Sequence, residues 1–356
     1  MSRSRNRRAA GESAPAPREE KRWYQKTGWL LAVSLLYYGI VAVGLRLALG
    51  AGFGALFRAW GVDAGTAARA PRWAQLVWRW HGSFVTAAVS AALIAASLVL
   101  RRMWRGAEPA ARALDAGGSS SGSRRAGGGQ ALSSASAGYE SRKAAPWWRG
   151  LGSGALAGLA AAAALLILGL AFDSLRMEPG SPKLHPSLFP LLLVSLLAAF
   201  AEELFTKGVL YDGLAGRWGS LWATAAATAV FFLSSGGLAG NIVSGVNVLL
   251  LGLLCCAVHG RCGLWADVGL RWGWSAATVF LFGFGGGEGS LMRFYAVSEA
   301  LLTGGDAGPV YGLYATVALA AGIAWLLCRK GGKKKRLPAP GGIGARERGR
   351  GSGEYK

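Results

Sequence analysis

Three charged residues lie close together in the apolar segment AEELFTKGVLYDGL: Glu202, Glu203 and Lys207. Ionisable groups at membrane depth each cost roughly 2.5 to 3.5 kcal/mol, so they usually line a cavity or form pairs. Glu203 and Lys207 are four residues apart, which predicts an ion pair along one face of a helix. Glu202 lies about 100° away on that helix and is free to point elsewhere. The alternative is that the whole set lies at the cytoplasmic interface, where such pairs form easily.

A second charged position follows in the segment GLWADVGLRWGWSAATVF, which contains Arg271. Arg271 is about eight residues from the inner end of the expected helix, which corresponds to a depth of about 12 Å. Glu202 falls at a similar level on an oppositely directed helix. Because a buried arginine needs an anionic partner, we predict that Glu202 or Glu203 lies within salt-bridge distance of Arg271. Ser275, one helical turn further on, is expected to line the same cavity.

A weaker cluster consists of Cys255, His259 and Cys262. Thiol and imidazole ligands suit zinc, but the sequence offers no fourth ligand, so structural packing is the favoured interpretation. We expect no cofactor and no metal. The four cysteines, which also include Cys256 and Cys328, fall at predicted helix ends rather than in an extracellular loop. A disulfide framework is therefore not expected.

The elements that carry these residues are predicted to be membrane helices. The chain is 52% hydrophobic and only 16% charged, whereas a soluble domain has roughly a quarter of its residues charged. Long stretches without charge predict an all-α fold, a polytopic membrane helix bundle with about eight transmembrane helices. The expected spans are residues 28–50, 82–100, 150–172, 187–211, 219–235, 242–258, 263–283 and 309–328.

Composition divides the chain into five parts. Residues 1–27 are Arg-rich and without apolar periodicity, which predicts a disordered basic cytoplasmic tail. Residues 28–102 form an N-terminal hairpin of two membrane helices, and residues 103–148 a Gly/Ser-rich cytoplasmic linker. Residues 149–328 form the membrane core, in which SLMRFYAVSEALL (290–302) is expected to be a short interfacial helix. Residues 329–356 are a second basic cytoplasmic tail.

The net charge of +21 has two interpretations, nucleic-acid binding or membrane topology. Most of the 39 Lys and Arg residues lie in the tails, in the linker and in segments on the same side of the expected bundle. This asymmetry is typical of cytoplasmic segments of membrane proteins, so nucleic-acid binding is not expected. We expect an integral protein of the bacterial inner membrane with both termini cytoplasmic. Its basic tails favour anionic lipids of the inner leaflet.

These segments together resemble the CPBP intramembrane proteases, the CAAX-processing and bacteriocin-processing family. The first motif of that family is Glu-Glu followed by Arg and then Gly, and it resembles Glu202, Glu203, Lys207 and Gly208. The stretch NVLLLGLLCCAVHGRCGLWADVGLRWGWS is similar to the last conserved stretch of the family, and VFFLSSGG falls where a Phe-x-x-x-His motif is expected. The resemblance covers about residues 187–283. It implies a membrane endopeptidase in which glutamate activates water, with His and Asn groups stabilising the oxyanion.

The sequence departs from the family at the histidine positions. Ser235 or Gly236, depending on register, replaces the first histidine, Arg271 replaces the second, and Ser275 replaces the asparagine. The resemblance thus names Glu202, Glu203, Lys207, Arg271 and Ser275 as candidate catalytic residues.

Three functions remain open after these departures. The first is a degenerate or repurposed family member in which the endopeptidase reaction is lost or altered. The second is an active endopeptidase that uses Glu202 or Glu203 and cleaves a membrane peptide. The third is a non-catalytic scaffold or a peptide- or lipid-binding protein. A transporter is disfavoured because no paired, Gly/Pro-broken helices are visible.

Overall fold

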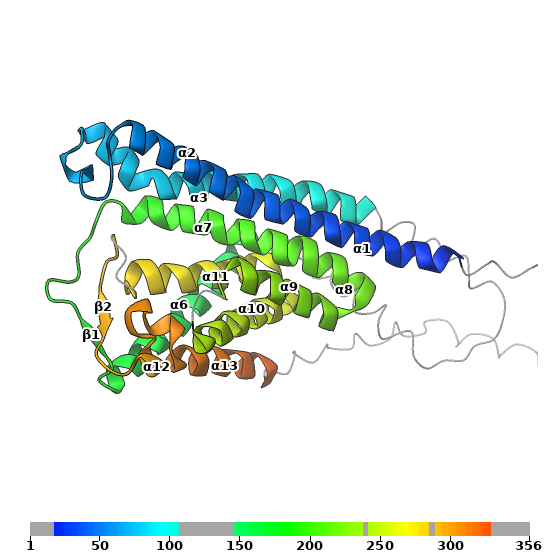
Figure 1. The fold of residues 1–356 in the computed structure, drawn as a ribbon. Coiled ribbons are helices and arrows are strands. Elements are labelled where there is room, and N and C mark those ends of the chain that lie inside the picture. The colour runs from blue at the N-terminus through cyan, green and yellow to red at the C-terminus, as the bar shows by residue number, and fades with distance from the viewer. Residues whose placement is uncertain (1–17, 107–145, 238–240, 285–288, 329–356) are drawn as a thin grey trace, which may run out of the picture.

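The computed structural model describes residues 18–106, 146–237, 241–284 and 289–328 of this chain (Figure 1). The expected all-α membrane bundle is confirmed for this part of the chain. Five described helices are long and apolar enough to cross a membrane: Thr27–Ala59, Arg72–Arg105, Trp147–Ala171, Leu188–Trp218 and Ile242–Cys262. The other three expected spans are also helical, but two of them are shorter apolar helices, Ser220–Ser234 and Leu313–Cys328. The third, Leu264–Ser275, carries two charged residues and continues to Leu281 as a wider π-type turn.

The N-terminal hairpin is longer than expected. Helix α1 (Arg18–Tyr38) continues through a π-type turn (Gly39–Leu45) into α2 (Arg46–Ala59), and α3 (Arg72–Gly106) returns beside it. Helix α1 therefore begins within the segment that was expected to be a tail. Their sequence, REEKRWYQKT, is rich in residues that favour helices, and a helix can continue beyond the membrane. Residues 1–17, most of the predicted linker and the predicted C-terminal tail lie outside the described residues.

The turn between α2 and α3 is organised by Asp63. Its carboxylate accepts hydrogen bonds from the backbone N–H groups of Gly65 and Thr66, both at 2.8 Å. A short 3₁₀ turn, Ala67–Arg69, follows and leads into α3. Hydrogen bonds from Thr66 and Gly65 to the charged form lower the pKa of Asp63 below its ordinary value.

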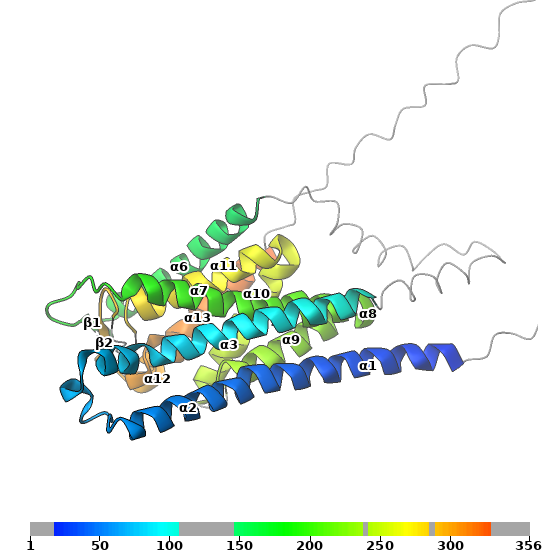
Figure 2. The same cartoon turned by 90° about the horizontal axis from the view of Figure 1, so that it is seen from above.

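Helix α7 (Leu188–Phe205) lies between the hairpin and the remaining helices (Figures 1 and 2). It continues through a π-type turn (Thr206–Tyr211) into α8 (Asp212–Trp218). On its far side lie α6 (Trp147–Ala171), α9 (Ser220–Ser234), α10 (Ile242–Cys262), α11 (Leu264–Ser275) and α13 (Leu313–Cys328). One apolar core joins α3 to α7 through side chains such as Leu93, Trp104 and Phe205, and a second fills the space among the other helices.

Two short strands close one end of the bundle. Strand β1 (Leu175–Met177) pairs antiparallel with β2 (Phe294–Ala296), with Met177 opposite Phe294. The prediction of a helix over residues 290–302 is therefore wrong for most of that segment. Only α12 (Ala300–Thr303) is α-helical there, because the backbone of residues 294–296 pairs with a distant segment instead. Two 3₁₀ turns, Gly305–Ala307 and Pro309–Tyr311, lead from α12 into α13.

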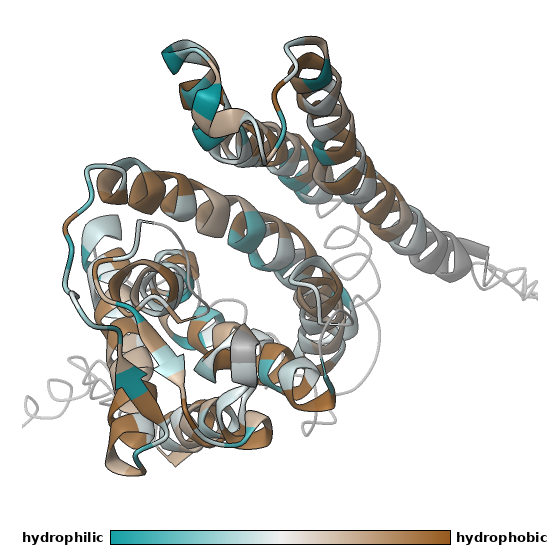
Figure 3. Cartoon of the chain, turned by 60° about the vertical axis from the view of Figure 1, so that its left-hand side comes forward, coloured by the Kyte–Doolittle hydropathy of each residue, from teal (hydrophilic) through white to brown (hydrophobic). Residues whose placement is uncertain are grey.

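Hydrophobic residues run along all the helices (Figure 3), and many of their large side chains are exposed. On the N-terminal helix Leu36, Ile40 and Leu47 are 66%, 59% and 67% exposed. A soluble monomer rarely exposes so continuous an apolar surface. The surface therefore fits a lipid environment, as the length and apolarity of the helices do.

Candidate functional site

The first charged pair forms within one continuous helix, between Glu203 near the end of α7 and Lys207 in the π-type turn that follows it. Lys207 Nζ is 2.6 Å from Glu203 Oε2, and neither side chain is exposed. The ion pair predicted from their spacing is confirmed. Both side chains are enclosed by protein, so this ion pair is not exposed to solvent. Lys207 stands in the π-type turn Thr206–Tyr211, and such turns within helices are frequent at functional sites.

The second pair joins α7 to α11. Arg271 Nη2 lies 3.6 Å from Glu202 Oε2, and Arg271 Nη1 donates a hydrogen bond of 2.6 Å to Ser275 Oγ. The Glu202 side chain is 29% exposed and that of Arg271 is 19% exposed. The predicted contact between Arg271 and a glutamate of the first motif is confirmed, and Glu202 is the glutamate involved. This ion pair therefore joins α7 to α11.

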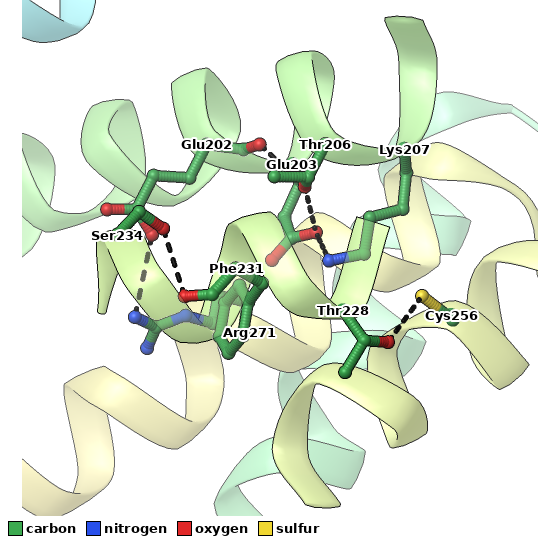
Figure 4. Close-up of polar contacts among 9 residues, drawn as sticks. All are labelled: Glu202, Glu203, Thr206, Lys207, Thr228, Phe231, Ser234, Cys256 and Arg271. Carbon is green, nitrogen blue, oxygen red and sulfur yellow. Dashed lines mark hydrogen bonds and ion pairs between the residues drawn. The ribbon is translucent and has the colours of Figure 1, made fainter. Parts of the chain in front are cut away.

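Phe231 separates the two ion pairs. Its ring, fully buried on α9, lies 4.7 Å from Lys207 Nζ and 5.3 Å from Arg271 Cζ, measured to the ring centroid. Figure 4 shows the ring beneath α7, with Glu202 and Arg271 on one side of it and Glu203 and Lys207 on the other. Both cations thus gain a cation–π contact with a desolvated ring. The ring therefore lies between the surroundings of Glu202 and those of Glu203, which differ although the two residues are adjacent in the chain.

Glu202 and Arg271 line a cleft of about 280 Å³. Its walls come from three elements, α3, α7 and α11 with its π-type extension. The lining residues are Gly82, Ser83, Thr86, Leu191, Val194, Ser195, Ala198, Ala199, Glu202, Arg271, Ser275 and Phe280. Ser275 lines the same cavity as Arg271, as predicted. Small and hydroxyl-bearing side chains dominate the walls, and of the described residues that line this cleft only Glu202 and Arg271 are charged.

Helix α11 is held against α7 beside the cleft by a further contact. The indole Nε1 of Trp272 donates to Leu192 O at 3.1 Å and to Ser195 Oγ at 3.2 Å. The π-type turn Ala276–Leu281 begins directly after Ser275. Arg271 and Ser275 are therefore positioned by a tethered helix that changes its winding next to the cleft.

The positions that correspond to the first family histidine lie at the end of α9. Ser235 caps that helix directly after its last residue, Ser234, and Gly236 follows with a φ of +73°. Since L-residues with side chains rarely adopt that conformation, Ser235 fits the histidine position better than Gly236. Neither residue lines the cleft.

Two groups of residues were not identified from the sequence. Asp267, one turn before Arg271, is fully buried beside Glu203 and Cys255. The sequence did contain a signal for Asp267, because an ionisable residue at membrane depth usually marks an ion pair or a functional site. His259 Nε2 lies 2.9 Å from Asp212 Oδ1, so it faces α8. The trio of Cys255, His259 and Cys262 does not come together as a possible metal site in the described residues.

The family model described as type II CAAX prenyl endopeptidase Rce1-like matches residues 184–277. The match identifies this region as Rce1-like. It runs from just before α7 to just after Ser275 and includes both ion pairs and Phe231. The predicted resemblance to the CPBP family is thereby confirmed for residues 184–277, and the long apolar helices support an integral membrane protein. No curated protein and no solved structure matches the chain.

One wall of the cleft lies outside the Rce1-like region. The residues that α3 contributes, Gly82, Ser83 and Thr86, belong to the N-terminal hairpin and lie outside the match. Helix α6, which packs against α11, also lies outside it. The site residues are thus family elements enclosed by additional helices of this chain.

Proposed function

We propose that this chain is a CPBP-type membrane protein in which the endopeptidase reaction is replaced by binding of a membrane peptide or lipid-linked partner in the cleft beside Glu202. The observation that carries the proposal is the Arg271 guanidinium, 3.6 Å from Glu202 Oε2 and 2.6 Å from Ser275 Oγ. Peptide hydrolysis by a glutamate requires a free carboxylate to take the proton of water. It also requires donors aimed at the developing oxyanion.

Arg271 changes both requirements. A guanidinium stays protonated at accessible pH, so it cannot exchange protons as a histidine does. It engages the carboxylate that would act as the base, and its Nη1 donor is already directed to Ser275. Loss of a single oxyanion donor lowers a rate by about 10² to 10³. The arrangement therefore favours recognition of a bound partner over its hydrolysis.

The second candidate function is an active glutamate-dependent endopeptidase, and the exposure of Glu202 in the cleft favours it. In that case Glu202 would be the base. Glu203 does not suit the role, because it is fully buried and paired with Lys207.

The proposal includes the surroundings of the protein. We place it in the bacterial inner membrane with both termini cytoplasmic, in contact with anionic lipid of the inner leaflet. Basic residues near both chain ends support this orientation.

Photo-crosslinking in liposomes tests the binding function. A lipidated membrane peptide with a photoreactive phenylalanine is incubated with the purified protein and irradiated, and mass spectrometry locates adducts. We expect adducts on cleft residues of α3 and α7. Thr86→Trp, which fills the cleft, should lower their yield at least about tenfold, equivalent to about 1.4 kcal/mol.

Thr224→Trp is the matched control. Thr86 and Thr224 both donate to the carbonyl four residues earlier at 2.8 Å, but only Thr86 lines the cleft. Equal adduct yields in the two variants, or adducts confined to other surfaces, would contradict binding in the cleft.

A further inference from the structure

A second group of side chains lies on the other side of Phe231 from the cleft. Glu203 on α7, Cys255 on α10 and Asp267 on α11 each present a possible ligand atom, and these atoms all lie within 4.8 Å of one another. All three side chains are fully buried. Three helices of the Rce1-like region thus bring two carboxylates and a thiol to one point.

Outside the group itself, three of its carboxylate oxygens find no hydrogen-bond donor among the described residues. Apart from Glu203 and Cys255 themselves, no described residue donates a hydrogen bond to Oδ1 or Oδ2 of Asp267, and none donates to Glu203 Oε1. Glu203 Oε2, in contrast, is engaged by Lys207 at 2.6 Å. Buried polar atoms without partners are rare in folded proteins, and each one calls for an explanation such as a bound ion. The free oxygens belong to the same two carboxylates that face Cys255.

The charges of the group point to a cation. Two carboxylates and the single ammonium of Lys207 leave one negative charge in a region closed to solvent. A divalent cation bound with loss of the Cys255 thiol proton brings the sum of charges to zero. Burial without such compensation is strongly unfavourable.

We propose that Glu203, Cys255 and Asp267 bind a zinc ion, with Lys207 neutralising the other oxygen of Glu203. One sulfur and two carboxylate oxygens are ligands that zinc accepts, whereas calcium and magnesium take oxygen ligands. Binding deprotonates the thiol, and the released proton passes to solvent. The competing occupant is a proton shared by the two carboxylates, with the Cys255 thiol as a further donor to Asp267.

Metal analysis of the purified protein tests the proposal. The full chain is purified in detergent without chelators, and zinc is measured by plasma mass spectrometry. We expect close to one zinc per chain in the wild type, and at least a tenfold loss in Cys255→Ser and Asp267→Asn. Replacement of zinc by Co²⁺ should give a thiolate-to-metal absorption band that Cys255→Ser lacks.

Cys256→Ser is the matched control. Cys256 is the adjacent buried thiol, but its sulfur lies 3.7 Å from Thr228 Oγ1 and it is not one of the three proposed ligands. This variant should keep the metal and the cobalt band. Size-exclusion profiles identify any variant that fails to fold, and the cobalt band of the wild type tests the site without any variant.

Three results would overturn the zinc site. One is a wild-type protein that holds neither zinc nor added Co²⁺. Another is equal metal loss in Cys255→Ser and Cys256→Ser. The third is an infrared band of a protonated carboxyl group in the wild type that disappears in Asp267→Asn, because it would show a proton in place of the metal.

Discussion

Among single residues, Phe231 explains how two neighbouring glutamates come to differ. Glu202 and Glu203 are adjacent in the chain, yet one faces a cleft with Arg271 and the other is enclosed with Lys207. The buried ring between the two cations contacts both of them. Each glutamate therefore has its own cation, and the two cations are kept apart.

A double-mutant cycle tests the Glu202–Arg271 pair. Removing one member strands the other charge, which typically costs about 3 to 5 kcal/mol for a fully buried pair. Because these side chains are 29% and 19% exposed, we expect about 1 to 3 kcal/mol for Glu202→Gln or Arg271→Gln, after discounting for solvent screening. The double variant should lose less than the sum, as measured by unfolding in detergent.

The exposed pair of Arg176 and Asp173, 3.3 Å apart, serves as the control for that cycle. Exposed pairs are typically worth less than about 1 kcal/mol. Additive losses at Glu202 and Arg271 would show that the two residues act independently.

The pairing of Arg271 could be predicted from the sequence, because a guanidinium at membrane depth requires an anion and few are available. Ser275 followed from its position one turn further on. The surroundings of Asp267 could not be predicted, since Glu203 and Cys255 come from two other helices. A single sequence does not specify which helix faces meet.

At the scale of the helices, glycines allow the backbones of α6 and α11 to lie in close contact. A Cβ added at Gly154 of α6 would lie 2.0 Å from Ala266 O, and one added at Gly273 of α11 would lie 2.2 Å from Ala155 O. Small residues that allow helix backbones to approach are common in membrane bundles. Since α11 carries Arg271, α6 helps to determine where the guanidinium lies.

Alanine substitutions within α6 test this packing. Gly154→Ala should destabilise the protein by about 1 to 3 kcal/mol, because the added methyl group meets backbone that cannot move aside. Gly152→Ala, in the same helix, has no atom within 4 Å of the added Cβ and should be neutral or slightly stabilising. Thermal unfolding of the two variants in one detergent measures the difference. Equal stabilities would show that the backbones are not in close contact.

Helix positions could be predicted well from the sequence, because each span produces a long apolar run. The strand pair could not be predicted, since Met177 and Phe294 meet only after the chain has folded. The segment around Phe294 resembled a short helix because its aromatic and apolar residues give no local signal for a partner strand. Residues 18–27 were assigned to a tail because composition shows where the apolar run begins. It does not show that the helix starts before that run.

In the whole molecule, the cleft extends toward the end that carries the strands. On α7 its lining runs from Leu191, near the start of that helix, to Glu202. The start of α7 lies at the end of the bundle that carries the strands (Figure 1). The start of α1 lies at the opposite end, as do the ends of α10 and α13, where Arg261 donates to Leu326 O. If both termini are cytoplasmic, as we propose, a partner would enter the cleft from the outer half of the membrane.

Labelling of cysteines tests this orientation. Cys262 and Cys328 are exposed at the ends of α10 and α13, and we expect an impermeant maleimide to reach them only from the cytoplasmic side. A cysteine placed at Asp63, in the turn between α2 and α3, should react only from the other side. Comparison of intact cells with inverted vesicles distinguishes the two cases. Labelling of Cys328 in intact cells would contradict a cytoplasmic C-terminus.

The central claim is that Arg271 has turned a catalytic carboxylate into part of a binding site. Its most direct test is the rate of cleavage of lipidated membrane peptides by the purified protein in liposomes, measured beside Glu202→Gln. We expect both proteins to show only the background rate, because the Glu202 carboxylate is engaged by the guanidinium 3.6 Å away. Wild-type cleavage that Glu202→Gln abolishes would contradict this account and establish Glu202 as the base of an active endopeptidase.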